Sequence, residues 1–150
     1  MTINLADDPR ISDEQYLTLK SKALESRNLS YSPYSKFRVG CTILTETDEY
    51  IVGANIENAS YGAAICAERT AIVKAATSGF MKFKALAVST DLETCASPCG
   101  ICRQVIREFS NDKQLPVYMF NKDGSKVIKM TIDELLPLSF GPEDLGMVTN

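Results

Sequence analysis

The sequence contains no histidine among its 150 residues, and this absence restricts its chemistry more than any other feature of the composition. Without histidine the chain can form neither a serine–histidine–aspartate triad nor a cysteine–histidine pair, and a zinc site cannot include imidazole. A general acid or base must therefore be Asp, Glu, Lys, Tyr or Cys. Long apolar runs are missing too: no stretch approaches the roughly 20 residues needed to span a membrane.

Positive charge is also scarce. The 16 basic residues are outnumbered by 19 acidic ones, and the densest basic cluster is the scattered "KFK" of Lys82–Lys84. A nucleic-acid-binding domain usually carries a basic patch or stripe, so we expect no nucleic-acid partner. The first fifteen residues, "MTINLADDPRISDEQ", contain neither a basic region nor an apolar run typical of a secretory signal. We therefore expect a cytoplasmic protein whose thiols stay reduced.

The hydrophobic pattern predicts one α/β domain over residues 1–150. The apolar fraction of 45% and the charged fraction of 23% are those of an ordinary globular chain. "ALAVST" is a short, continuously apolar run, as expected for a strand buried on both faces. We expect about five strands in a mixed sheet with helices on its faces. The predicted helices are 12–28, 65–76, 98–110 and 131–137, and the predicted strands are 37–44, 50–55, 85–90, 116–121 and 126–131.

Turn and cap residues support these boundaries. Ser12 is a candidate N-cap of the first helix, and Thr131 and Glu134 have the spacing of a capping box. Gly79 fits the position just past a helix end. Pro98 is predicted at the first position of its helix, where a missing N–H is tolerated.

Three cysteines lie at the starts of two predicted helices. Cys66 begins one helix, and Cys99 and Cys102 begin another in "SPCGIC". Positions i and i+3 share a helix face, so two sulfur atoms reach one point, and the third joins them if the helix starts converge. The positive ends of two helix dipoles, with Arg69 nearby, would offset the charge of three thiolates and lower their pKa values.

A three-cysteine zinc site leaves its fourth ligand open. Cys95 is the nearest further sulfur, but it lies four residues before Cys99 and across a proline; Cys41 lies within a predicted strand and is interpreted as a core residue. An open position occupied by water is the pattern of a catalytic zinc. Beside such a site Glu68 becomes a candidate base for that water, although an isolated helical glutamate is more often simply solvated.

Two other interpretations of the cysteines remain open at this point. A structural zinc module would use four protein ligands and would have no need of Glu68. A thiol–disulfide protein would use "CGIC" at a helix start as its redox pair, which leaves "CAE" at Cys66 unexplained.

Four separated segments, taken in order, resemble a known enzyme family. They are "FRVG…GANIENASY" between Phe37 and Tyr61, "CAERTAI" from Cys66, "SPCGICRQ" from Ser97, and "ELLPLSFGPEDL" near the C-terminus. Together they resemble the homotetrameric cytidine deaminases of pyrimidine salvage. The likeness runs from about Leu29 to Leu145, and the first eleven residues, a predicted N-terminal extension, carry no matching motif.

The resemblance implies a three-layer α-β-α fold and one Zn²⁺ per chain, bound by the three cysteines. It implies that Glu68 takes a proton from water, passes it to N3 of the pyrimidine and later protonates the departing amine. Arg69 resembles the arginine that hydrogen-bonds to the zinc thiolates. Gln104 would support the site from outside the ligand shell.

The resemblance also implies the substrate contacts. Asn55 and Glu57 in "NIEN" resemble the pair that binds the ribose 3′-hydroxyl, and no contact is inferred for the 2′-hydroxyl. We therefore expect cytidine and 2′-deoxycytidine as substrates, with a blasticidin-type deaminase as the alternative. The remaining contacts are Phe37 against the base, the backbone of Ala67 and Ser97 on its polar groups, Tyr34 and Tyr61 between subunits, and Phe140 from a neighbouring subunit.

Overall fold

A computed structural model describes residues 5–147. Its centre is a five-stranded mixed sheet of order β2-β1-β3-β4-β5. Only β3 and β4 run parallel, while the pairs β1–β2, β1–β3 and β4–β5 are antiparallel. The strands are β1 (Val39–Thr45), β2 (Tyr50–Ala54), β3 (Phe83–Thr90), β4 (Pro116–Phe120) and β5 (Val127–Thr131). The predicted mixed sheet of about five strands is confirmed.

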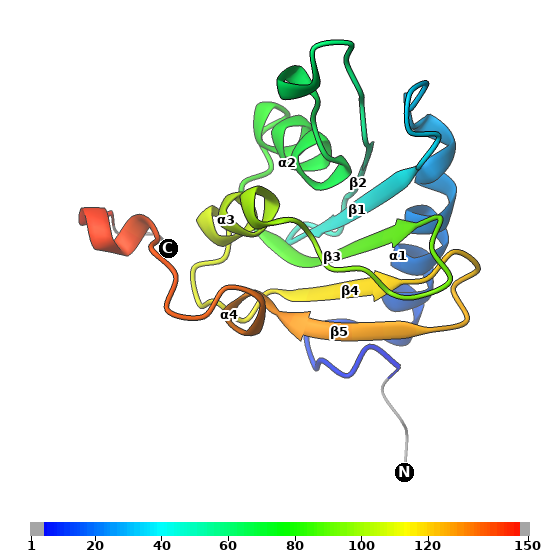
Figure 1. Cartoon of the computed structure of the whole chain (residues 1–150). Helices are drawn as coiled ribbons and strands as arrows, with labels where there is room; N and C mark the ends of the chain where they lie inside the picture. The colour runs from blue at the N-terminus through cyan, green and yellow to red at the C-terminus, as the bar shows by residue number, and fades with distance from the viewer. Residues whose placement is uncertain (1–4, 148–150) are drawn as a thin grey trace.

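Helices cover both faces of this sheet (Figure 1). The main helices are α1 (Asp13–Ser26), α2 (Ala67–Thr77), α3 (Gly100–Glu108) and the short α4 (Ile132–Leu135). Three short 3₁₀ turns, η1 (Arg27–Leu29), η2 (Tyr61–Ala63) and η3 (Pro142–Leu145), complete the elements of the described part of the chain.

Two hydrophobic cores lie on opposite sides of the sheet. In the first, Ala71 and Ile72 of α2 and Ile106 of α3 pack against residues of β1, β3 and β4. In the second, Tyr16 and Leu19 of α1 pack against the other face of the same strands. The arrangement is the three-layer α-β-α fold expected from the resemblance. β3 is buried along nearly its whole length, as predicted for a strand covered on both sides.

The predicted caps are found at three of four places. Ser12 and Gln15 form a reciprocal capping box at α1, and Thr131 and Glu134 form another at α4. Gly79 has a φ of 91°, which suits the residue after α2.

The prediction for Pro98 is wrong: Cys99 is the N-cap, with extended backbone, and α3 begins at Gly100. Pro98 therefore lies just before the N-cap of α3, and Arg103 of the helix donates to its carbonyl oxygen at 2.8 Å.

The segment before α1 contributes to the second core, although it carries no motif. Ala6 and Ile11 are at most 1% exposed. The Tyr118 hydroxyl of β4 donates a hydrogen bond to the Ala6 carbonyl oxygen, which ties this segment to the sheet.

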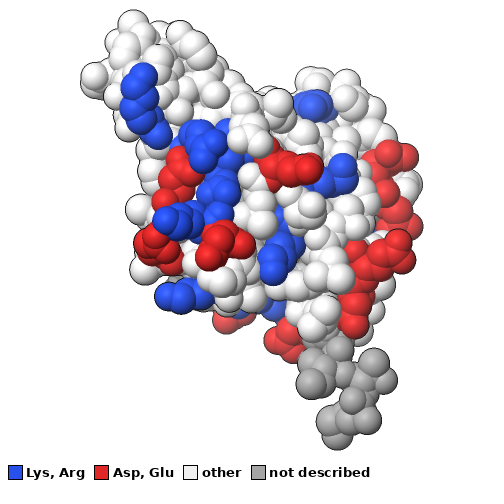
Figure 2. All heavy atoms as spheres, turned by 90° about the vertical axis from the view of Figure 1, so that its right-hand side faces the viewer, with Lys and Arg blue, Asp and Glu red and all other residues white. Residues whose placement is uncertain are grey.

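None of the described helices is long and apolar enough to cross a membrane. On the face shown in Figure 2, basic side chains lie beside acidic ones and form no unbroken patch.

Candidate active site

The N-termini of α2 and α3 bring three thiols together. Cys66 is the N-cap of α2, Cys99 is the N-cap of α3, and Cys102 lies in the first turn of α3. Their sulfur atoms all lie within 4.8 Å of one another, and the Cys66 and Cys99 sulfurs are 3.8 Å apart. A tetrahedral zinc with Zn–S bonds of about 2.3 Å separates its sulfur ligands by about 3.8 Å. The donor set therefore fits Zn²⁺.

The electrostatics of this cluster favour a thiolate at Cys66. Hydrogen bonds from Cys102, Arg69 and Cys99 lower the pKa of Cys66 to about 5. The pKa of Cys102 is raised, because its proton is held against Cys66 and the thiol is buried. Arg69 Nη2 donates to the Cys66 sulfur at 3.5 Å. Arg69 Nε is buried with no hydrogen-bond partner among the described residues, so it keeps a donor free beside the cluster.

The carboxyl group of Glu68 lies directly beside the thiols. Glu68 is the second residue of α2 and is 4% exposed. The Cys102 sulfur lies 3.6 Å from Glu68 Oε2. Burial raises the pKa of Glu68 above that of a solvated glutamate. An almost fully buried carboxyl group next to a metal-ligand cluster is suited to exchanging protons with a group bound there.

A cavity of about 540 Å³ opens onto the cluster. It unites segments far apart in the chain: the approach to β1, the loop after β2, the start of α2, and the loop before α3. Its lining includes Cys66, Cys99, Glu68 and Arg69. Six of the residues predicted to contact substrate also line it: Phe37, Asn55, Glu57, Tyr61, Ala67 and Ser97.

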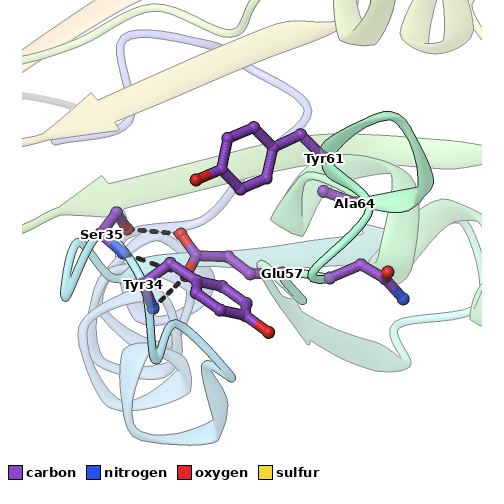
Figure 3. A pocket seen from close by; sticks show the side chains of 6 residues that line it. Tyr34, Ser35, Glu57, Tyr61 and Ala64 are labelled. Carbon is purple, nitrogen blue, oxygen red and sulfur yellow. Dashed lines mark hydrogen bonds between the residues drawn. The ribbon is translucent and has the colours of Figure 1, made fainter.

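Glu57 is held by the loop before β1. Its carboxylate accepts hydrogen bonds from the backbone N–H groups of Tyr34, at 3.0 Å, and Ser35, at 3.2 Å, and from the Ser35 hydroxyl, at 2.5 Å (Figure 3). The Ser35 hydroxyl bond is the main cause of the lowered pKa of Glu57. Glu57 is therefore an anionic acceptor at the wall of the cavity. Sequence patterns alone did not single out Ser35, because the reason for its presence is this contact with a residue 22 positions away.

Asn55 is likewise oriented by neighbours. Its Oδ1 accepts from the Val39 N–H at 2.9 Å and from the Ser30 hydroxyl at 2.5 Å, and its Nδ2 donates to the Phe37 carbonyl at 2.9 Å. These bonds fix which end of the amide is oxygen. They leave one Nδ2–H of Asn55 as a donor, which complements the acceptor Glu57.

Four of the predicted site residues do not line this cavity, and one of them is Cys102, which is fully buried beneath it. Tyr34 lines an adjoining cavity of about 380 Å³ that shares Glu57 and Tyr61 with the first (Figure 3). Phe140 is 58% exposed and belongs to the C-terminal segment that projects beside α3 (Figure 1). Gln104 was expected to support the metal site, but its amide donates to the Phe140 carbonyl at 2.9 Å. Its side chain therefore contacts the C-terminal segment, and its support of the metal site stays a prediction.

The two other cysteines lie outside the cluster. Cys41 is fully buried in β1 within the first core, and burial raises the pKa of its thiol well above the usual value. Cys95 packs half-buried against the same core. Neither belongs to the group of thiols close enough to share a metal ion.

Three convergent thiols, an open fourth position and a buried carboxyl group define a class: the hydrolytic zinc enzymes. Comparison with known proteins then gives the family. The family described as "Cytidine and deoxycytidylate deaminase zinc-binding region" matches residues 13–119. The chain belongs to this family.

Individual relatives agree with this assignment. The chain is 47% identical over 134 residues to the cytidine deaminase of Sporosarcina psychrophila, covering 89% of this chain and 96% of the relative. It is 43% identical over 128 residues to that of Halalkalibacterium halodurans, covering 85% and 96%. The crystal structure of cytidine deaminase from Burkholderia pseudomallei is similar with a TM-score of 0.79 and 37% identity, covering 83% of this chain and 98% of that one. These relatives favour the pyrimidine enzyme over the blasticidin-type alternative.

Proposed function

We propose that this protein hydrolyses cytidine to uridine and ammonia, and 2′-deoxycytidine to 2′-deoxyuridine. The observation that carries the proposal is one cavity lined by two thiols of the three-thiol cluster, the buried carboxyl of Glu68, and the polar pair Asn55 and Glu57. A structural zinc site would need a fourth protein ligand, and no further cysteine, aspartate or glutamate among the described residues lies close enough to join the cluster. A redox pair would need neither Glu68 nor the polar pair.

The proton transfers fall to Glu68. Zn²⁺ held by the three thiolates would supply a fourth position for water and lower the pKa of that water. The Glu68 carboxylate takes a proton from water as its oxygen adds to C4 of the base, and it delivers that proton to N3. A second transfer through the same carboxyl group protonates the departing amine. The raised pKa of Glu68 suits both steps, because the group has to hold the proton between them.

The other cavity residues bind and orient the nucleoside. Phe37 packs against the pyrimidine ring, and the backbone at Ala67 and Ser97 meets its polar groups. The ribose 3′-hydroxyl donates to the Glu57 carboxylate and accepts from the free Nδ2–H of Asn55. This pair forms one donor and one acceptor for a single hydroxyl, and it leaves the 2′-hydroxyl without an assigned partner. Acceptance of both nucleosides follows from that arrangement.

Assembly and location complete the proposal. We infer a homotetramer in which Phe140, Tyr34 and Tyr61 meet neighbouring subunits; exposures of 58%, 51% and 80% leave these aromatic rings available for such contacts. We infer a single deaminase domain preceded by a short extension. A reducing cytoplasm would keep the cluster as thiols able to bind metal.

The test is product identification with the purified full chain. Incubation with cytidine, and separately with 2′-deoxycytidine, should give uridine and 2′-deoxyuridine by chromatography, with ammonia released in equal amount. Zinc content is measured on the same sample. Zinc without conversion of either nucleoside would contradict the proposal, and turnover of cytidine alone would contradict the dual specificity.

A further inference from the structure

The main chain on both sides of Phe37 is held by three side chains, two of which come from other segments. The Phe37 N–H donates to the Ser35 hydroxyl at 3.0 Å, and the Phe37 carbonyl accepts from Asn55 Nδ2 at 2.9 Å. The next N–H, that of Arg38, donates to Asp91 Oδ2 at 2.9 Å. Ser35 and Asn55 already adjoin the proposed ribose site. Asp91 does not line the cavity, and the catalytic scheme gives it no part.

Regular secondary structure does not hold Phe37 in place. β1 begins at Val39, and its first pairing with β3 joins Val39 to Thr90. Phe37 and Arg38 therefore precede the ladder of strand hydrogen bonds. A segment without ladder bonds is fixed by whatever side-chain bonds it makes. The position of the Phe37 ring in the cavity consequently depends on these few contacts.

Asp91 is itself rigidly placed. It directly follows β3, and its carboxylate accepts from Arg38 Nε at 3.1 Å and Nη2 at 2.9 Å as well as from the Arg38 N–H. Arg27 lies 3.5 Å away and also donates to the carbonyl oxygens of Thr90, at 2.7 Å, and Lys122, at 2.6 Å. One carboxylate thus joins the end of α1, the end of β3 and the residue after Phe37.

The geometry points to Asp91 as a positioning residue for substrate binding: its bond to the Arg38 N–H sets where the Phe37 ring lies in the cavity. The inference rests on the proposed function, in which Phe37 packs against the base. Because that contact is made in the bound substrate and does not take part in proton transfer, losing it weakens binding and leaves the chemical step intact.

Three variants separate this role from general stabilisation. Asp91→Ala removes the acceptor of the Arg38 N–H and should raise KM for cytidine about tenfold, as expected for loss of one hydrogen bond to a charged group, with kcat within about twofold. Asp91→Asn keeps an acceptor oxygen and should restore KM to within about threefold. Arg38→Met is the matched control: it abolishes the Arg38–Asp91 ion pair but keeps the backbone bond, so KM should stay near that of the unmodified protein.

Two further measurements, amide hydrogen exchange and zinc content, complete the test. Amide hydrogen exchange at Arg38 should be about tenfold faster in Asp91→Ala and unchanged in Arg38→Met, and this reading does not depend on activity. Zinc content should be equal in all variants. Equal KM effects in Asp91→Ala and Arg38→Met would overturn the inference and assign the effect to the ion pair. Loss of zinc in Asp91→Ala, or unchanged amide exchange at Arg38 in that variant, would also overturn it. Absence of deamination by the unmodified chain would instead overturn the proposed function, while the exchange experiment still tests the bond.

Discussion

Replacing Glu68 by glutamine keeps the size of the side chain and removes its ability to carry a proton. The amide oxygen remains an acceptor next to the Cys102 thiol, so the metal cluster should persist. The other cavity carboxylate, Glu57, is bound by Tyr34 and Ser35. No third carboxylate among the described residues lines the cavity, so none is placed to replace Glu68.

The expected loss follows from the two proton transfers assigned to Glu68. General acid–base catalysis contributes about 10²- to 10⁴-fold, so Glu68→Gln should lower kcat by at least about 10³-fold, or about 4 kcal/mol of barrier. The assay is the initial rate of cytidine loss, with zinc measured on the same protein. Glu108→Gln, the same chemical change at an exposed position of α3, is the control and should leave kcat unchanged. A zinc-loaded Glu68→Gln variant with kcat within about tenfold of the unmodified enzyme would refute the assigned role.

Four further outcomes are expected. Cys102→Ala should lose stoichiometric zinc by atomic absorption and lower Tm, since metal binding is linked to folding; a full zinc content would contradict the ligand set. The pKa of Asp91 is lowered by its hydrogen bond from Arg38. Its carboxylate therefore stabilises the fold fully above the unfolded-state pKa of about 3.9, and this contribution is lost as pH falls through the lower folded-state pKa. Tm should consequently fall more steeply between about pH 5 and pH 2.5 in the unmodified protein than in Asp91→Asn, and parallel curves would count against it. Arg107 is 1% exposed and donates to three partners, two of them in the C-terminal segment. Arg107→Met should lower the free energy of unfolding in urea by about 2–4 kcal/mol, and a change below about 1 kcal/mol would be inconsistent with these contacts. Finally, 2′,3′-dideoxycytidine should react with a kcat/KM at least about tenfold below that of 2′-deoxycytidine, whereas equal values would remove the 3′-hydroxyl contact.

Local sequence signals predicted the elements and the metal centre well. The spacing of Cys99 and Cys102, and the position of Cys66 at the start of another helix, led to the thiol cluster that the structure contains. Capping residues such as Ser12 and Thr131 located helix starts, because a cap acts on backbone groups only a few residues away. Signals of this kind depend on neighbours in the sequence, and the sequence displays those directly.

Contacts between distant segments could not be predicted in the same way. Arg107 looks like a solvated basic residue on an amphipathic helix, yet it is buried because the C-terminal segment covers it. Gln104 bonds to that same segment for the same reason. Ala6 and Ile11 carry no motif, but they fill the core on the α1 side of the sheet. In each case the partner lies more than 30 residues away or in another layer, where periodicity gives no information.

Pro98 shows a smaller failure of local reasoning. Proline is favoured at the first helical position, but the residue just before an N-cap suits it as well. Pro98 takes the position before the N-cap, where Arg103 of α3 donates to the Pro98 carbonyl and to the Ser97 hydroxyl. These bonds tie α3 to the segment that leads to Cys99, and the sequence does not show them.

The most direct test of the account is the ultraviolet absorbance of cytidine incubated with the purified full chain, with zinc determined on the same sample. The account predicts conversion to uridine with about one zinc per chain, the stoichiometry of a single three-thiol site. Bound zinc with no change in the cytidine spectrum would contradict the proposed reaction, and an active protein without zinc would contradict the metal centre on which it depends.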